Sequence, residues 1–178
     1  LLYGPSGVGK TTLAHVIAME TQSRFVKVNA VTAGTADLRK LIGEAKDAVC
    51  MYQKRTILFI DEIHRFNKAQ QDVLLPYVED GTIILIGATT ENPYFEVNRP
   101  LLSRLRVMQL NALTKEAVAS VLRRALQDEI NGLGKMEITA TSDILMTIAS
   151  YADRDARMGL NLLEQICMLV PRRGTITQ

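Results

Sequence analysis

Tryptophan is absent from this chain of 178 residues, and cysteine and histidine each occur only twice. His15 and His64 do not stand at a zinc-site spacing from the cysteines, so the sequence excludes a structural zinc domain. Cys50 and Cys167 are far apart, each in an apolar helical stretch, and we expect both to be buried free thiols. Unpaired buried cysteines suit a reducing cytosol.

Strong net charge and long apolar runs are also missing. The 21 lysines and arginines against 19 aspartates and glutamates leave a charge of +2, which is too small to indicate a nucleic-acid partner. No apolar run approaches the length of a membrane span, and no signal peptide is visible. We therefore expect no membrane partner and a cytoplasmic location, for a chain long enough to bury a sizeable core.

The first distinctive motif begins at the fourth residue. Gly4–Thr11 reads GPSGVGKT, which matches the phosphate-binding pattern G-x-x-x-x-G-K-T. Glycines allow successive backbone N–H groups to turn toward a polyphosphate, Lys10 reaches the β- and γ-phosphates, and the Thr11 hydroxyl is suited to Mg²⁺. The residues that we expect to bind the nucleotide are Gly4, Pro5, Ser6, Gly7, Val8, Gly9, Lys10, Thr11 and Thr12. A glycine-rich turn that matches by chance is the alternative interpretation.

The flanking residues give this motif the strand–loop–helix context that it requires. Leu1–Tyr3 has the character of the last residues of a strand, and residues 12–19 form a helical pattern. Because the strand before a phosphate loop is normally complete, we expect native sequence to precede Leu1. Residues that pack against an adenine from that side would then lie outside this chain.

Strands and helices alternate along the first part of the chain. The expected strands cover residues 24–29, 56–60, 82–87 and 107–110, with helical patterns between the first three of them. This alternation predicts an α/β domain over residues 1–110, with helices on both faces of a parallel sheet. Residues 111–178 show only helical patterns and predict a small all-helical domain.

An acidic pair, Asp61 and Glu62, follows the apolar strand at 56–60. This position is the edge of an open α/β sheet at which ligands bind. Asp61 is suited to orient Mg²⁺ and its waters, and Glu62 to act as general base for a water that attacks the γ-phosphate of ATP. Thr90, after the next strand, could hold that water beside Glu62. The alternatives are a solvated acidic pair at the start of a loop and a threonine that caps a strand.

A GTPase is disfavoured by the segment Asn67–Gln70, which superficially matches the guanine-reading pattern N-K-x-D. Gln70 lacks the carboxylate that would pair with guanine, and the segment follows the wrong strand. Asn67 with Gln70 instead predicts a capping box at the start of a helix.

The motifs in this order resemble an AAA+ P-loop ATPase of the clamp-loader and RuvB-like group. The stretch Ile57–Asn98, ILFIDEIHRFNKAQQDVLLPYVEDGTIILIGATTENPYFEVN, closely resembles the RarA/MgsA family (replication-associated recombination protein A), whose eukaryotic relatives include the Werner-helicase-interacting ATPase. The resemblance covers nearly the whole chain. It implies that Gly4–Thr11 is Walker A, with Ser6 where many members have proline, that Ile57–Glu62 is Walker B, and that residues 111–178 form the helical lid.

The resemblance also implies roles for three polar residues. Thr90 falls at sensor 1. Asn29 matches the polar residue that, in many AAA+ proteins, restrains the catalytic glutamate until a partner binds. Arg104 lies in a stretch similar to the clamp-loader S-R-C signature, with Leu105 in place of cysteine, and would be an arginine finger acting on a neighbouring subunit. Arg106 is the second choice, and an ordinary surface arginine is the alternative for either.

Two further segments are less regular. Residues 154–157, RDAR, resemble the sensor 2 pattern G-D-x-R, which makes Arg157 the lid arginine that contacts the γ-phosphate. Arg154 stands where the pattern has glycine, so the following helix is expected to start differently. His64, Arg65 and Phe66 follow Walker B as in RuvB-like proteins, and the sequence indicates no mechanism for them. We expect a packed loop there, with contact to a neighbouring subunit or DNA as the alternative.

The function implied by the resemblance is a DNA-dependent ATPase that uses ATP and Mg²⁺ in replication-fork maintenance, recombination and repair, associated with the bacterial nucleoid. The expected partners are forked, gapped or single-strand-containing DNA, further copies of the full-length protein in a homo-oligomer, and a single-strand binding protein or a helicase. The family's polymerising helical domain is not in this chain, so we expect the fragment to be monomeric and poorly active.

Two other functions stay open on the sequence. One is a nucleotide-binding scaffold that does not hydrolyse ATP, against which stand the intact residues Lys10, Asp61, Glu62 and Arg104. The other is a clamp-loader-like or RuvB-like motor subunit that works on a sliding clamp or a helicase.

Overall fold

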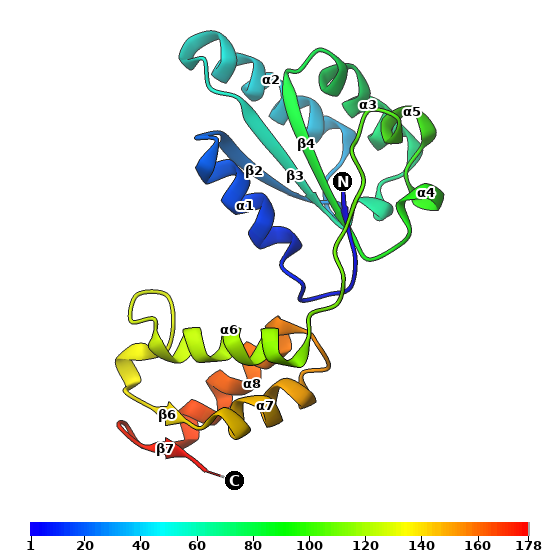
Figure 1. The fold of residues 1–178 in the computed structure, drawn as a ribbon. Helices are drawn as coiled ribbons and strands as arrows, with labels where there is room; N and C mark the ends of the chain where they lie inside the picture. The colour runs from blue at the N-terminus through cyan, green and yellow to red at the C-terminus, as the bar shows by residue number, and fades with distance from the viewer. Residues whose placement is uncertain (178) are drawn as a thin grey trace. The chain divides into compact units, whose positions relative to one another are not determined.

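The protein is described over residues 1–177 by a computed structural model (Figure 1). These residues form two compact units. The first contains Leu1–Gly4 and Lys10–Leu110, and the second contains Pro5–Gly9 and the chain from Asn111 onward. Pro5–Gly9, which make up most of the phosphate loop, therefore belong to the second unit. In the sequence they stand between β1 and α1, which belong to the first unit.

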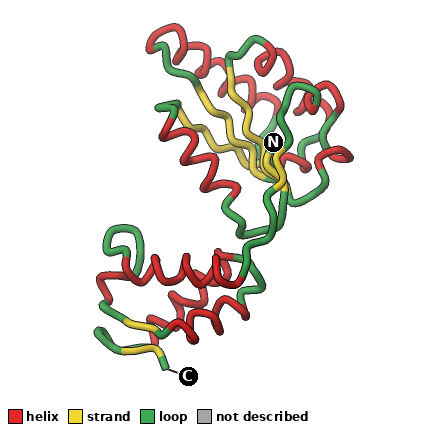
Figure 2. Tube along the Cα trace, viewed as in Figure 1, coloured by secondary structure: helices red, strands yellow, loops and turns green. Residues whose placement is uncertain are grey.

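The described residues of the first unit build a five-stranded parallel sheet in the order β2-β3-β4-β1-β5, which Figure 2 colours yellow. Its elements are β1 (Leu2–Tyr3), α1 (Lys10–Glu20), β2 (Arg24–Asn29), α2 (Thr35–Tyr52), β3 (Thr56–Asp61), the 3-10 helix η1 (Ile63–Arg65), α3 (Lys68–Glu79), β4 (Ile83–Thr89), α4 (Pro93–Glu96), α5 (Arg99–Leu102) and β5 (Met108–Gln109). The predicted α/β fold is confirmed.

Strand β3 lies inside the sheet and is buried on both faces. Leu58 and Ile60 pack with α2, α3 and α5, whereas Ile57 and Phe59 point to the other face and pack with α1 (Figure 1). This two-sided burial explains why the strand is apolar from Ile57 to Ile60. The polar side chain that follows this run, that of Asp61, therefore falls at the carboxyl edge of the sheet.

Helix α3 begins with the predicted capping box. The Asn67 side-chain oxygen accepts a hydrogen bond from the backbone N–H of Gln70 at 2.9 Å, and the backbone N–H of Asn67 donates to the Gln70 side chain at 2.8 Å. These two bonds satisfy donors that a helix start would otherwise leave unpaired.

The second unit contains helices around their own apolar core, together with a small sheet. Its elements are α6 (Lys115–Gln127), the 3-10 helix η2 (Gly134–Met136), β6 (Thr139–Ala140), α7 (Ser142–Tyr151), α8 (Ala156–Leu169) and β7 (Thr175–Ile176). The largest side chains fully buried in this core are Val118, Leu122, Leu145 and Leu163.

The prediction that residues 111–178 are all helical was wrong. Strands β6 and β7 pair in parallel, with Thr139 opposite Thr175, and the two threonine hydroxyls lie 3.0 Å apart. Strands of two residues carry no alternation of apolar and polar side chains, so periodicity could not detect them. Their pairing joins segments that are 36 residues apart, which only the tertiary structure decides.

The two cysteines differ in burial. Cys167 is fully buried in the second core, as expected, and its burial raises the pKa of its thiol. Cys50 is exposed, so the prediction of a second buried thiol was wrong. The buried stripe of α2 runs through Leu38, Ile42 and Ala45, and the helical repeat turns Cys50 away from it.

Among residues 1–177, no helix is both long enough and apolar enough to cross a membrane.

Replacing Leu58 by alanine should lower the free energy of unfolding by about 2–5 kcal/mol, because it leaves a cavity between the sheet and its helices. Urea unfolding followed by circular dichroism measures this loss. Ile84→Ala in the neighbouring strand is the control, since Ile84 is 37% exposed and should lose much less. Equal losses for both variants would contradict the two-sided burial of β3.

Candidate nucleotide-binding site

The phosphate loop joins β1 to α1 and uses backbone angles that favour glycine. Gly7 has φ +65° and Gly9 has φ +92°, both in the left-handed range. A Cβ on Gly9 would meet nothing within 4 Å, so the backbone angle, and not crowding, requires glycine there. Such turns present backbone N–H groups in a concave arrangement that binds anions.

Lys10 begins α1, and its ammonium donates a hydrogen bond to the carbonyl oxygen of Gly4 at 2.7 Å. The positive side chain therefore lies near the start of the motif, at the positive end of the helix dipole. Thr11, half-buried, and Thr12, exposed, follow in the first turn of α1. A lysine and backbone N–H groups at a helix start match the chemistry of a polyphosphate.

Asp61 ends β3 on the sheet face that α1 covers. It follows Phe59 by two residues, and alternate residues of a strand share a face. An Asp61 carboxylate oxygen lies 3.5 Å from the Lys27 ammonium. Asn29 is opposite Asp61 in the ladder between β2 and β3. The carboxylate is therefore partly exposed at the sheet edge, beside one cation.

Glu62 leaves the strand through a tight turn. Its backbone has φ +54° and ψ +47°, a left-handed conformation that is uncommon for residues other than glycine. The Arg65 Nε donates to the Glu62 carboxylate at 2.6 Å. This hydrogen bond, with the positive charges of Arg65, His64 and Lys10, lowers the pKa of Glu62. The regular strand therefore ends at Asp61, and Glu62 begins the turn into η1.

No hydrogen bond joins the Asn29 side chain to Glu62 in the described part of the chain. Its side-chain oxygen accepts a hydrogen bond from the backbone N–H of Val31 at 2.9 Å and so stabilises the loop after β2. The restraining role that the resemblance implies for Asn29 stays a prediction.

The end of β4 presents two threonines with different surroundings. The strand reaches Thr89, two residues beyond the expected end, and Thr90 follows it exposed. The Thr89 hydroxyl is buried, 2.9 Å from His64 Nδ1, and accepts a hydrogen bond from the backbone N–H of Glu91 at 2.9 Å. The sequence pointed to Thr90 and not to Thr89. Two adjacent threonines at the end of a strand made either of them a candidate for the polar residue at this edge of the sheet. The role of Thr90 stays a prediction.

Arg104 lies on the surface just after α5. It donates to the carbonyl oxygen of Pro100 at 2.7 Å and to the Ser103 hydroxyl at 3.0 Å, and it forms an ion pair with Glu79 of α3. Helices α3 and α5 cover the sheet face opposite α1 (Figure 1). Arg106, the second choice, is also exposed.

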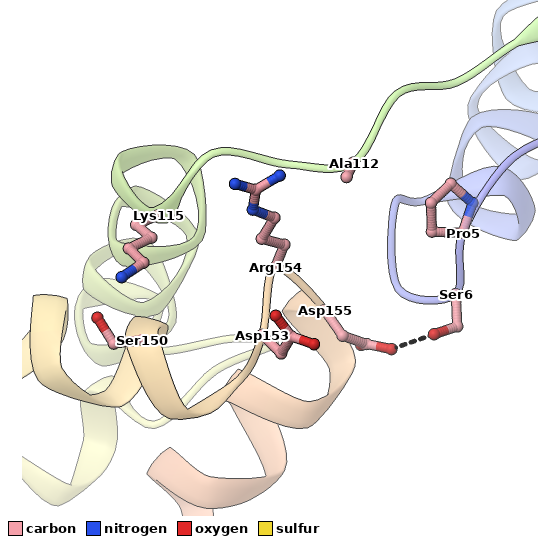
Figure 3. Close-up of a pocket in the computed structure, with 8 residues that line it drawn as sticks. All are labelled: Pro5, Ser6, Ala112, Lys115, Ser150, Asp153, Arg154 and Asp155. Atoms are coloured by element: carbon pink, nitrogen blue, oxygen red, sulfur yellow. Dashed lines mark hydrogen bonds between the residues drawn. The ribbon is translucent and has the colours of Figure 1, made fainter.

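In the second unit, the loop residues contact the start of α8. The Ser6 hydroxyl donates to the Asp155 carboxylate at 2.6 Å (Figure 3), while the other oxygen of Asp155 caps α8 by accepting from the Met158 N–H at 3.0 Å. The Ala156 N–H donates to the Gly7 carbonyl at 3.3 Å. A Cβ on Gly7 would lie 1.9 Å from an Asp155 oxygen, so only glycine allows this approach.

A polar cavity of about 540 Å³ adjoins this contact (Figure 3). It is lined by Pro5, Ser6, Ala112, Lys115, Ser150, Asp153, Arg154 and Asp155. Arg157 is exposed in the first turn of α8. Arg154, which stands where the sensor 2 pattern has glycine, adopts φ +68°, and the helix starts two residues later with Asp155 as its cap. The turn thus keeps a conformation that glycine would adopt more easily.

The donors available for a metal ion are hard oxygen atoms. Thr11 offers a hydroxyl and Asp61 a carboxylate, and both belong to the first unit. No group of three or more histidine, cysteine, aspartate or glutamate side chains gathers anywhere in residues 1–177. Mg²⁺ is usually held by one or two carboxylates with phosphate and water oxygens, so these residues fit it.

The fold and the loop together define a P-loop nucleotide-binding domain. The chain belongs to the ATPase family associated with various cellular activities (AAA), whose family model matches residues 1–113.

Relatives of known sequence agree with this family. The chain is 48% identical to replication-associated recombination protein A of Haemophilus influenzae over 92% of its own length and 36% of that protein. It is 46% identical to ATPase WRNIP1 of Dictyostelium discoideum, over 92% of the chain and 18% of that protein. The chain therefore spans little more than a third of the bacterial relative. The resemblance to the RarA family is confirmed.

A solved structure shares the fold. The RuvB Holliday junction branch migration motor of Thermotoga maritima matches 93% of this chain and 52% of its own chain, with a TM-score of 0.76 and 29% identity. Nucleotide binding by this domain follows from the family and from the loop geometry.

Asp155 provides a test of the second unit by pH. Partial burial acts to raise the pKa of Asp155, but hydrogen bonds from Ser6, Met158 and Arg157 outweigh it and hold the pKa below its usual value. A lowered folded-state pKa stabilises the fold fully above the unfolded value of about 3.9, and this stabilisation is lost as the pH falls through the folded value.

Asp155→Ala should reduce the free energy of unfolding at neutral pH by about 1 kcal/mol, because α8 loses its cap. Asp155→Asn keeps the capping oxygen without the charge, so it should stay near wild type at pH 7 and lose less stability on acidification. Urea unfolding from pH 7 to pH 3 measures both effects. An Asn variant with the wild-type pH dependence would contradict the assignment.

Proposed function

We propose that this chain is the ATP-hydrolysing core of a DNA-dependent AAA+ ATPase that acts in replication-fork maintenance, recombination and repair. The observation that carries the proposal is the acidic pair Asp61–Glu62 at the carboxyl end of β3, in the same unit as Lys10 and Thr11. A nucleotide-binding domain without a water-activating carboxylate would bind ATP but would not cleave it efficiently.

The reaction in this proposal is attack of water on the γ-phosphorus of ATP. Glu62 accepts a proton from the water, the water oxygen forms the new bond in line with the breaking one, and ADP leaves with the bridging oxygen. Lys10 and the loop N–H groups hold the β- and γ-phosphates and stabilise the developing charge. Thr11 and Asp61 would hold Mg²⁺, which neutralises phosphate charge when bound. Thr90 would orient the water, Asn29 would restrain Glu62, and Arg157 would contact the γ-phosphate.

Arg104 is proposed to complete the site of a neighbouring copy. Its position is exposed, on the helical layer opposite α1, where a second copy could approach it. An arginine supplied from a neighbour stabilises charge in the transition state of phosphoryl transfer. The proposal therefore includes a homo-oligomer of the full-length protein.

The DNA-directed part of the proposal is supported by the names of the relatives, which are replication-associated recombination proteins. Forked, gapped or single-strand-containing DNA is the proposed partner, with replication proteins such as a single-strand binding protein or a helicase as further partners. The likeness to the RuvB branch migration motor favours a motor subunit as the second candidate.

Glu62→Gln should keep ATP affinity but lose turnover by a factor of about 10²–10⁴, since it removes the proton acceptor. Lys10→Ala should instead lose ATP binding itself. Steady-state hydrolysis by the full-length protein, with and without forked or gapped DNA, and binding of a fluorescent ATP analogue separate the two effects. A wild-type protein that binds ATP but never hydrolyses it with any DNA would support a scaffold instead.

Arg104→Ala in the full-length protein should lower turnover by a factor of about 10³–10⁵ with ATP affinity unchanged. Mixing this variant with Lys10→Ala subunits should restore part of the activity, because the intact Arg104 of the second variant can serve the intact site of the first. Arg106→Ala is the matched control and should hydrolyse ATP at the wild-type rate. A mixture that stays inactive would contradict action across a subunit boundary.

A further inference from the structure

A second pocket lies at the amino edge of the parallel sheet, wholly within the first unit. Helix α1 ends at Glu20 and leads into β2, and α2 ends at Tyr52 and leads into β3, so both turns lie where these strands begin (Figure 1). Arg55 lines the pocket and precedes β3, and six steps of about 3.3 Å place Asp61 about 20 Å further along the strand. The pocket is therefore separate from the acidic pair at the carboxyl edge.

The pocket has a volume of about 650 Å³ and is lined mainly by these two turns. Residues 21–23, before β2, supply hydroxyl and amide groups. Residues 52–55, at the end of α2 and in the turn after it, supply an aromatic ring, an amide and two cations. Strand β4 adds Ile84. Pockets of this size hold ligands as large as a nucleotide.

Hydrogen bonds join the two turns and order their backbones. The Arg24 N–H donates to the Arg55 carbonyl at 2.8 Å and so connects the start of β2 to the turn before β3. The Thr21 hydroxyl donates to the Ile17 carbonyl at 2.7 Å and lies 2.9 Å from the Ser23 hydroxyl. The turns therefore form a fixed base from which the longer side chains extend.

Lys54 and Arg55 give the pocket a positive charge that no carboxylate in its lining offsets. Both residues are exposed, and neither forms an ion pair within residues 1–177. By contrast, the neighbouring Arg24 pairs with Glu44 at 2.6 Å. Lysine and arginine side chains that lack a carboxylate partner are available to bind phosphate groups.

An aromatic ring lies beside these cations in the sequence. Tyr52 is the last residue of α2, and it is 76% exposed. Exposed aromatic rings serve as stacking platforms for bases in proteins that bind single strands, where a positively charged groove follows the phosphates. The bases of a duplex are already stacked on one another, so an unpaired strand is the form that can use such a ring.

We propose that this pocket binds single-stranded DNA, with a base stacked on Tyr52 and backbone phosphates held by Lys54 and Arg55. The inference rests on the DNA-directed part of the proposed function and assigns to it a site on this chain. Docking of an apolar protein surface is the competing use, because Met51 is 71% exposed. The lining favours DNA, since it contains both cations and the ring but not Met51.

The test is binding of a fluorescein-labelled, single-stranded oligothymidylate to the full-length protein, measured by fluorescence anisotropy over a range of salt concentrations. Tyr52→Ala should weaken binding about fivefold or more, because a stacked base loses its platform. Tyr52→Phe keeps the ring and should bind like wild type. Should Tyr52→Ala not fold, as judged by circular dichroism, Tyr52→Leu retains an apolar side chain without an aromatic face and carries the same expectation.

Salt dependence separates the cations from the ring. The double variant Lys54→Ala/Arg55→Ala should make the slope of log affinity against log salt concentration shallower by about 1.4, since each phosphate contact to a single strand contributes about 0.7. Tyr52→Ala should leave this slope unchanged. The matched control is Arg123→Ala/Arg124→Ala, which removes two exposed cations from α6 and should keep the wild-type slope. An equal change of slope in both double variants would refute the site, because binding would then follow total charge.

Failure of this site and failure of the proposed function give different results. If the wild-type protein binds no single-stranded DNA, the DNA-directed part of the proposed function fails together with the inference. If wild type binds the strand and the Tyr52→Ala and Lys54→Ala/Arg55→Ala variants bind it equally well, only the inference is refuted. A Tyr52→Ala variant that keeps DNA affinity but loses a protein partner identifies a protein interface and also refutes it.

Discussion

Burial of β3 on both faces of the sheet is the constraint on which the candidate site depends. Because Ile57–Ile60 are packed between helices on both faces, the polar side chain that follows them lies at the carboxyl edge of the sheet. The same burial holds α1 against one face, so Lys10 and Thr11 start their helix from a supported position. The start of α1 and the acidic end of β3 are thus both supported by the packing of this sheet.

At that edge, the two acidic residues have different environments. Asp61 ends the regular strand and lies near the ammonium of Lys27, whereas Glu62 occupies a left-handed turn and pairs with Arg65. A left-handed conformation persists at a non-glycine residue only when the surroundings stabilise it. Here the buried Ile63 and Phe66 do so. The Arg65 and Glu62 side chains remain 54% and 45% exposed beside this packed turn.

Within the second unit, the phosphate-loop residues Ser6 and Gly7 contact the start of α8. Asp155 uses one carboxylate oxygen to cap α8 and the other to accept a hydrogen bond from Ser6. A change in the loop would therefore also affect the start of α8, the helix that carries Arg157.

Local sequence determined the phosphate loop, the order of strands and helices, the buried strand that leads to Asp61 and the capping box of α3, because each depends on neighbouring residues and regular periodicity. The exposure of Cys50, the β6–β7 pairing, and the hydrogen bonds of Glu62 with Arg65, His64 with Thr89, and Ser6 with Asp155 were decided only by the tertiary structure. These features depend on which face of a helix is covered, or on the direction in which a turn points a side chain. The spacing of residues along the chain determines neither of these.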